Sequence, residues 1–183
     1  GASPALRITA FACAMLLAAV PAAASQDMPF TVEVAGGKVA GSATDDGAVF
    51  RGIPFAAPPT GDLRWRAPRP VEPWEGVLDA TDAAPACLQH LESSEWNRAD
   101  WLRGSEDCLT LNIWTPADAE RAPVFVWIHG GSLAAGSSRE AIYDGRKLAE
   151  RGLVVVSINY RLGALGWLAH PELSDESPEG VSG

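Results

Sequence analysis

Hydrophobic and polar residues follow two patterns along this chain, and each pattern predicts a different kind of strand. Residues 31–41 alternate between apolar and polar around a central pair of glycines, which predicts a β-hairpin. Residues 108–114 alternate in the same way, and a further strand is expected over residues 48–51. Residues 124–128 and 153–158 are instead almost wholly apolar and rich in β-branched residues. Such runs are typical of strands buried on both faces inside a parallel sheet.

The stretch between the two apolar runs predicts a short helix. Asp144 can cap a helix over residues 145–151, and Gly152 can end it. The order strand, crossover and strand then implies a right-handed βαβ unit. Residues 54–73 differ, because their many prolines exclude both a helix and a central strand. Since tryptophans accompany these prolines, we expect an ordered loop packed on the body of the protein rather than a linker.

The first apolar run ends abruptly at His129-Gly130-Gly131, where two glycines let the backbone turn and a ligand approach. In an open α/β sheet, ligands bind beyond the carboxyl ends of the strands, which is where this loop would lie. Unpaired backbone N–H groups at such a turn can stabilise a developing oxyanion. A tight turn without any catalytic role is the alternative, and these residues alone favour neither interpretation.

Residues 1–24 have the layout of a secretory signal peptide. Arg7 precedes an apolar stretch that leads into a small-residue segment ending at Ala24. The apolar stretch is too short to span a bilayer comfortably, so no stable membrane anchor is predicted. A buried helix is the alternative, but position and flanks favour cleavage near Ala24 and a secreted or periplasmic protein. The chain begins without methionine and ends in loop-like composition, so we expect residues 25–183 to be an incomplete domain.

The net charge of the chain restricts the macromolecules that it could bind. The formal net charge of −9 argues against nucleic acid and anionic membranes as binding partners.

The cysteines predict a disulfide. Cys13 lies in the expected signal peptide, which leaves Cys87 and Cys108 as an even pair in an exported chain. We expect a disulfide between them, worth about 3 kcal/mol for a loop of about 20 residues, with two buried free thiols as the alternative. No metal or cofactor is predicted.

Four stretches, in this order along the chain, resemble the type-B carboxylesterase family, which includes bacterial carboxylesterases and the cholinesterases. They are Phe50-Arg51-Gly52-Ile53-Pro54-Phe55-Ala56 with Pro58-Pro59-x-Gly61, Ser105-Glu106-Asp107-Cys108-Leu109-x-Leu111-Asn112-Ile113, Trp127-Ile128-His129-Gly130-Gly131, and Asn159-Tyr160-Arg161-Leu162-Gly163 with Gly166. The Glu-Asp-Cys-Leu signature is the specific one. The match covers nearly all of residues 25–183, but only the opening part of such a domain.

The resemblance implies an α/β fold, the N-terminal part of an α/β-hydrolase, with a mostly parallel central sheet preceded by the antiparallel hairpin. It also implies a Ser, Glu/Asp, His triad that attacks carboxylic esters. The backbone N–H groups of Gly131 and Ser132 match the family's oxyanion-hole donors. Many relatives have a third glycine where this chain has Ser132, but a backbone donor is available from serine too.

The three histidines are not expected to act as the catalytic base. In this fold the triad follows the order Ser, acid, His along the chain, so a histidine this early is excluded. That excludes His90, His129 and His170. We expect His129 to hold the glycine loop through a hydrogen bond, and the other two to be surface residues.

Two further features are interpreted through the resemblance. It implies a structural ion pair between Arg64 and Glu106 beside the disulfide, rather than a carboxylate used for acid–base chemistry. Trp96 resembles the cholinesterase tryptophan that faces a quaternary ammonium group by cation–π contact. Packing in a wall of the protein is the favoured alternative for Trp96.

The expected function is hydrolysis of a small-molecule carboxylic ester through an acyl-enzyme, with nucleophile, acid and base beyond Gly183. The alternatives are an inactive cholinesterase-like domain used for binding or adhesion, and an inactive truncated product. Expressed alone, these residues are expected to be inactive, with their sheet left open at residues 154–158. Ser182 lies in the one near match to a nucleophile elbow, but no strand precedes it. The acyl group, the alcohol and the oligomeric state stay open.

Overall fold

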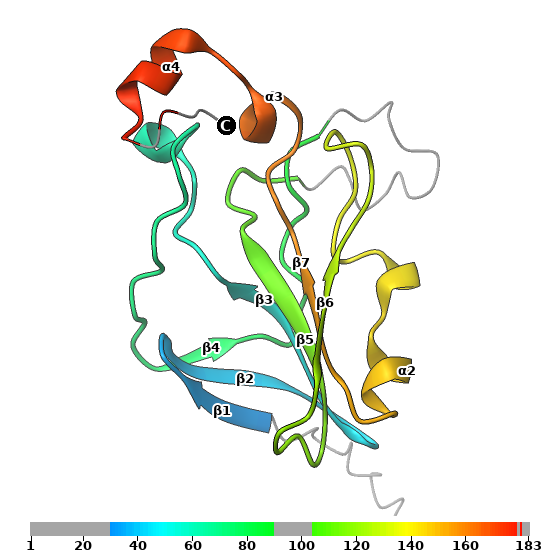
Figure 1. Ribbon diagram of the computed structural model, residues 1–183. Coiled ribbons are helices and arrows are strands. Elements are labelled where there is room, and N and C mark those ends of the chain that lie inside the picture. The colour runs from blue at the N-terminus through cyan, green and yellow to red at the C-terminus, as the bar shows by residue number, and fades with distance from the viewer. Residues whose placement is uncertain (1–29, 90–103, 179, 181–183) are drawn as a thin grey trace, which may run out of the picture.

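The computed structural model describes residues 30–89, 104–178 and 180 of the chain. These residues form a seven-stranded sheet of order β1-β2-β3-β5-β7-β6, with β4 paired to β2 (Figure 1). The strands are β1 (Phe30–Val34), β2 (Gly37–Thr44), β3 (Gly47–Pro54), β4 (Val77–Asp79), β5 (Thr110–Pro116), β6 (Val124–Ile128) and β7 (Val154–Ile158). The helical segments are η1 (Gly61–Leu63), η3 (Ala141–Tyr143), α2 (Arg146–Ala149), α3 (Gly163–Trp167) and α4 (Pro171–Glu176).

The amino-terminal strands form two consecutive hairpins. β1 and β2 run antiparallel with Val34 opposite Gly37, which confirms the hairpin predicted over residues 31–41. β2 and β3 are antiparallel as well, and β3 contains the strand predicted at residues 48–51. The alternating residues of these strands enclose a small apolar core of Val39, Ala48, Phe50 and Ala80. Tight turns between neighbouring strands therefore build this end of the sheet.

Strand direction in the rest of the sheet differs from the expectation. β5 runs antiparallel to both β3 and β7. Among the described strands, only the β6–β7 and β2–β4 pairs are parallel. The expectation of a mostly parallel central sheet is therefore wrong for the described residues, where the sheet is mixed and mostly antiparallel. Tight turns join only antiparallel strands, whereas the helical crossover from β6 to β7 lets those two run parallel.

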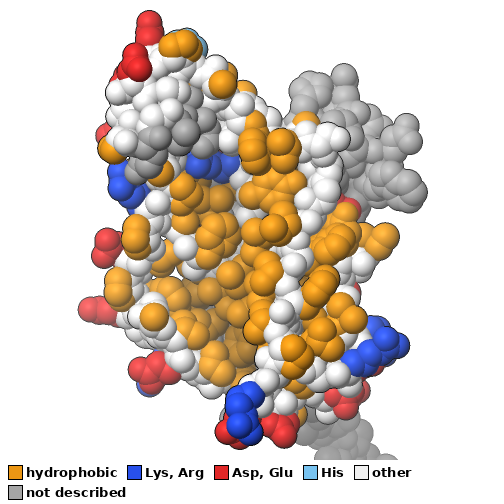
Figure 2. Space-filling model, in the orientation of Figure 1, with side chains coloured by type: hydrophobic (Ala, Val, Ile, Leu, Met, Phe, Trp, Pro, Cys, Tyr) orange, Lys and Arg blue, Asp and Glu red, His pale blue; other side chains and the backbone are white. Residues whose placement is uncertain are grey.

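β6 is an edge strand of the described sheet, and it is largely exposed. Val124, Val126 and Ile128 are 63%, 54% and 60% exposed. The prediction that residues 124–128 are buried on both faces is wrong here, because β6 pairs only with β7 among the described strands. The expected open edge at residues 154–158 is wrong for the same reason, since β7 lies between β5 and β6. Figure 2 shows hydrophobic side chains gathered over the middle of this view of the molecule.

The helix between β6 and β7 is present but shorter than predicted. α2 covers Arg146–Ala149 rather than residues 145–151. The N-cap is Gly145 rather than the predicted Asp144, and it makes no side-chain capping hydrogen bond. The Asp144 carboxylate, one residue earlier, still accepts the amide N–H of Arg146 at 2.9 Å. The helix lies against one face of the sheet, where Ala149 packs with Trp114 of β5. A short helix with a polar outer side is enough to carry the chain back to the start of β7.

The proline-rich stretch at residues 54–73 is an ordered loop packed on the body of the protein, as predicted, but it contains the single 3-10 turn η1, although the prolines were expected to exclude any helix. Trp65 Nε1 donates to the carbonyl oxygen of Ala164 in α3 at 2.8 Å. Just beyond the stretch, Trp74 Nε1 donates to the carbonyl oxygen of Lys38 in β2, also at 2.8 Å. The two tryptophans therefore fasten the loop to the carboxyl-terminal helices and to the first hairpin.

Some sequence predictions fall outside the described ranges. These are the signal peptide at residues 1–24, His90, Trp96 and Ser182. Within the described ranges, none of the helices has the length and apolar character needed to cross a membrane. The same ranges contain no group of three or more His, Cys, Asp or Glu side chains placed to hold a metal ion.

Candidate functional site

The loop that follows β6 has an irregular backbone. Gly131 has a φ of 119°, and Ser132 and Leu133 have φ values of 55° and 60°. The Gly131 carbonyl oxygen accepts the N–H groups of Ala134 and Ala135, both at 3.0 Å. The chain therefore turns back on itself directly beyond the carboxyl end of β6, at the same end of the sheet as α3 (Figure 1).

Two glycines make this turn possible. A Cβ at Gly131 would collide with the carbonyl oxygen of Ala135. A Cβ at Gly136, where φ is 117°, would collide with the His129 ring and the Gly130 carbonyl oxygen. Both positions therefore need glycine for space as well as for conformation.

Ser132 and Leu133 adopt left-handed backbone conformations although both carry side chains. That conformation costs roughly 1–2 kcal/mol per residue. The Leu133 carbonyl oxygen accepts the N–H of Gly163 at 2.7 Å, which ties the loop to the start of α3. Backbone strain persists only where the surrounding structure over-determines it, and such places cluster at active sites and ligand clamps.

The same turn leaves two adjacent amides available to a ligand. Among the hydrogen bonds within the described residues, none is donated by the N–H of Gly131 or Ser132. Both residues are exposed. Neighbouring backbone amides of this kind can bind an oxygen atom that carries or gains negative charge.

His129 fixes the start of the loop. Its side chain is buried, its Nδ1–H donates to the Gly130 carbonyl oxygen at 2.8 Å, and its ring stacks on Tyr160 with centroids 4.4 Å apart. The Tyr160 hydroxyl donates to the His129 carbonyl oxygen at 2.8 Å. Burial lowers the pKa of His129, partly opposed by the Gly130 hydrogen bond and by Glu140, so the ring is neutral near pH 7. The predicted loop-holding role of His129 is confirmed, and His170 is exposed, as predicted.

Buried side-chain amides hold the returning half of the loop. Asn112 Nδ2 donates to the carbonyl oxygen and hydroxyl of Ser138 at 3.3 and 3.2 Å, and Asn159 Oδ1 accepts the Ser138 N–H at 2.9 Å. Asn112 Oδ1 also accepts the N–H of Gly52, where β3 bulges away from β5. Only 4% of Asn112 and 2% of Asn159 are exposed. No such role was predicted for either residue, because a single asparagine within an alternating strand carries no signal of a distant partner.

Cys87 and Cys108 form a disulfide in the structure, with Cα atoms 5.0 Å apart. Both are buried, and they pack with Leu162 and Tyr160. Because Tyr160 also stacks on His129, the disulfide and the loop share a neighbour. The disulfide is therefore linked to the start of the loop through the packing of Tyr160.

Arg64 and Glu106 make a two-point contact beside that disulfide. Arg64 Nε and Nη2 donate to the two carboxylate oxygens at 2.5 and 2.6 Å. The hydrogen bond from Arg64 holds the pKa of Glu106 below its ordinary value of 4.5, against a smaller opposing effect of burial. A carboxylate kept ionised in this way is a poor proton donor near neutral pH and a good structural anchor.

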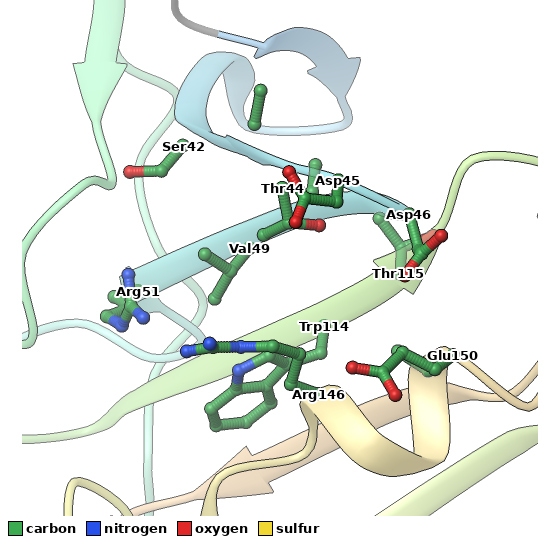
Figure 3. Close-up of a pocket in the computed structure, with 13 residues that line it drawn as sticks. Ser42, Thr44, Asp45, Asp46, Val49, Arg51, Trp114, Thr115, Arg146 and Glu150 are labelled. Carbon is green, nitrogen blue, oxygen red and sulfur yellow. The ribbon is translucent and has the colours of Figure 1, made fainter. Parts of the chain in front are cut away.

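A separate cavity of about 340 Å³ lies at the other end of the strands. It is lined by the turn between β2 and β3, by the end of β5 and by α2. Figure 3 shows the side chains of Arg146, Trp114 and Arg51 among those that line this cavity. None of its lining residues belongs to the loop after β6, so the two sites are distinct.

One protein family matches nearly all of the described residues. The model described as "Carboxylesterase family" matches residues 29–179. The chain belongs to the carboxylesterase family. The matched range includes the disulfide, the Arg64–Glu106 pair and the loop at Gly131. The resemblance to this family seen in the sequence is thereby confirmed.

Individual carboxylesterases match over the same region. The chain is 47% identical over 167 residues to the fumonisin B1 esterase of Sphingopyxis macrogoltabida, covering 90% of this chain and 31% of that protein. It is 44% identical over 134 residues to the para-nitrobenzyl esterase of Bacillus subtilis (strain 168), covering 72% and 27%. A solved structure of a PNB esterase matches with a TM-score of 0.71 and 42% identity, over 81% of this chain and 30% of that one. The chain therefore spans less than a third of the length of these relatives.

Proposed function

We propose that the full-length protein is a serine carboxylesterase with the α/β-hydrolase fold. It would transfer the acyl group of a carboxylic ester to a serine and then to water. The observation that carries this proposal is the loop after β6, where the exposed amides of Gly131 and Ser132 donate no hydrogen bond to any other described residue. In the reaction these two N–H groups would bind the ester carbonyl oxygen as it gains negative charge.

The energy available from such a site supports the assignment. Losing one oxyanion donor typically raises the barrier by roughly 2.7–4 kcal/mol. Donors contribute this much only when they are already oriented, and here the backbone around them is held by His129, Asn112 and Asn159. The nucleophile, acid and base are proposed to lie outside these residues. The relatives share ester hydrolysis in their names but differ in the ester named, so we propose a carboxylic ester substrate without naming its alcohol.

The test uses the purified full-length protein. We expect turnover of a nitrophenyl ester, covalent labelling by a fluorophosphonate, and a labelled serine that maps outside residues 1–183, so that labelling of Ser182 would contradict the proposal. Replacement of the labelled serine by alanine should abolish turnover and labelling. A folded protein without turnover or labelling would overturn the proposal and favour the inactive binding domain.

Export is part of the same proposal, motivated by the signal-like residues 1–24. Amino-terminal sequencing of the secreted or periplasmic protein should give a start close to Ser25. A mature protein that retains Arg7 would contradict export through cleavage of this segment.

A further inference from the structure

Gln89 binds both backbone polar groups of a single loop residue. Its side-chain Oε1 accepts the N–H of Gly136 at 2.8 Å, and its Nε2 donates to the Gly136 carbonyl oxygen at 3.1 Å. Nε2 also donates to the carbonyl oxygen of Cys87 at 3.0 Å. The carboxamide of Gln89 therefore acts on Gly136 much as a neighbouring strand would, using one acceptor and one donor.

Gly136 is the point at which the loop returns to its own beginning. Its Cα lies so close to the His129 ring and the Gly130 carbonyl oxygen that an added Cβ would collide with both. Between these two ends, the Gly131 carbonyl oxygen is bound by the amides of Ala134 and Ala135. Fixing Gly136 therefore closes a loop whose other end is already fixed by His129, and the two proposed donors lie inside that loop.

Gln89 is itself held by a rigid part of the molecule. Cys87, two residues before it, is buried and crosslinked to Cys108. The Leu88 N–H donates to the Ser105 carbonyl oxygen at 3.2 Å, and the Ser105 N–H donates to the Ala86 carbonyl oxygen at 2.9 Å. The position of Gln89 is thus set by the disulfide at Cys87 and by the backbone pairing of Ala86 and Leu88 with Ser105.

We propose that Gln89 is a positioning residue of the oxyanion loop, which transmits the rigidity of the Cys87–Cys108 disulfide to Gly136. This inference rests on the proposed esterase function. Gln89 touches the loop backbone and not the reacting atoms, so its effect is on the placement of the Gly131 and Ser132 amides. The role needs a donor and an acceptor on one side chain of this length, which a glutamine provides and an ionised glutamate or a methionine does not.

The experiment compares Gln89→Met and Gln89→Glu with the wild type in the full-length protein. Methionine keeps the length but removes both hydrogen-bonding groups. We expect kcat and kcat/KM to fall together by about tenfold to a hundredfold, with KM nearly unchanged, because an oxyanion donor acts in the transition state. Affinity for a boronic acid that forms a tetrahedral adduct should fall in proportion, while affinity for a non-reactive product analogue should not.

Gln89→Glu adds a pH readout that a general loss of stability would not produce. The ionised carboxylate can accept the Gly136 N–H but places negative charge beside the carbonyl oxygens of Gly136 and Cys87. The protonated carboxyl regains one donor. The ratio of kcat for this variant to kcat for the wild type should therefore rise as the pH falls.

Val39→Ala is the matched control, since Val39 is fully buried in the hairpin core and has no contact with the loop. It should lower the melting temperature and leave kcat of the folded enzyme unchanged. An unchanged kcat in Gln89→Met, or a fall no greater than in Val39→Ala, would overturn the positioning role while leaving the esterase proposal intact. A wild type without any turnover would instead overturn the proposed function, and this inference with it.

Discussion

The two ends of the sheet are held together in different ways. At the hairpin end, tight turns join β1 to β2 and β2 to β3, and β4 and β5 then add to these strands through regular backbone pairing. At the loop end, the backbone of residues 129–138 is bound by side chains from elsewhere in the chain. Gln89 reaches Gly136 over a sequence separation of 47, and Tyr160 reaches His129 over one of 31. Backbone-to-backbone pairing thus builds the scaffold, whereas the loop that exposes the Gly131 and Ser132 amides is held by side chains that are distant in the sequence.

The two ends of the sheet also differ in the residues that adopt positive φ angles. The turn residues with positive φ at the hairpin end include Gly37 and Gly47, which adopt such angles without a steric penalty. The loop end places Ser132 and Leu133 in the left-handed region, at roughly 1–2 kcal/mol each. The polar contacts to Gly136 and Ser138 offset that cost. Stability should therefore depend mainly on the hairpin end, and turnover mainly on the loop end.

The largest expected effect is on stability at the hairpin end. Phe50 is 3% exposed, lies in the core of the two hairpins, and meets the Phe30 ring edge-on at a centroid distance of 6.0 Å. Phe50→Ala should lower the free energy of unfolding of the full-length protein by about 3–5 kcal/mol, because it leaves a cavity. Urea denaturation measures this loss, and kcat per folded molecule should stay within about twofold. A tenfold fall in kcat with little loss of stability would break the proposed division between the two ends.

The next effect is on turnover at the loop end. Proline fixes φ near −65° and lacks an N–H, whereas Ser132 has a φ of 55°. Ser132→Pro should therefore lower kcat by about a hundredfold to a thousandfold, equivalent to roughly 2.7–4 kcal/mol of barrier. Ser132→Ala keeps the amide and should keep kcat within a few-fold. Ser132→Gly should do the same and raise stability by up to about 1 kcal/mol, since glycine tolerates a positive φ.

The two conservative changes decide the interpretation of Ser132. Proline can distort the loop as well as remove a donor, so its effect alone does not separate the two causes. If Ser132→Ala lost as much activity as Ser132→Pro, the hydroxyl rather than the backbone amide would carry the chemistry. Steady-state kinetics on one nitrophenyl ester, with melting curves for each variant, distinguishes these outcomes.

Sequence patterns predicted the hairpin end well and the loop end only incompletely. The alternation over residues 31–41 and the helix signal after Asp144 are local, and the structure contains a hairpin and a short helix at these places. The direction of β5 could not be predicted, because alternation reports which face is buried and not which neighbour the strand meets. The exposure of β6 could not be predicted either, since an apolar run indicates a buried strand without showing which residues cover it.

The polar contacts of the loop end escaped prediction for another reason. Gln89, Asn112 and Asn159 have no periodic spacing, and each binds backbone that is far away in the sequence. The family resemblance identified the stretch around Gly131 and the Arg64–Glu106 pair. Apart from His129, which was expected to hold the loop, it did not identify the side chains that keep the loop in place.

The smallest expected effect is that of a substitution at Glu106. This residue belongs neither to the hairpin core nor to the loop after β6, and it lies beside the disulfide. Its pKa is lowered in the folded protein by the hydrogen bond from Arg64, below the ordinary value of 4.5. A depressed carboxyl pKa contributes stability that is present above pH 4.5 and is lost as the pH falls through the folded pKa. Glu106→Gln should therefore unfold more easily than the wild type at neutral pH, and the difference should shrink in acid.

The loss should be smaller than that of Phe50→Ala, because the side chains of Arg64 and Glu106 are 38% and 22% exposed and water screens their attraction. Glutamine also keeps one acceptor for the Arg64 guanidinium, so some of the contact survives. Turnover of the folded variant should match the wild type, since neither residue contacts Gly131 or Ser132. Urea denaturation at neutral pH and below pH 4.5, with kcat measured beside it, tests each expectation. A large fall in kcat with unchanged unfolding would place Glu106 in the chemistry, and a stability difference that persisted in acid would show that its charge is not the source.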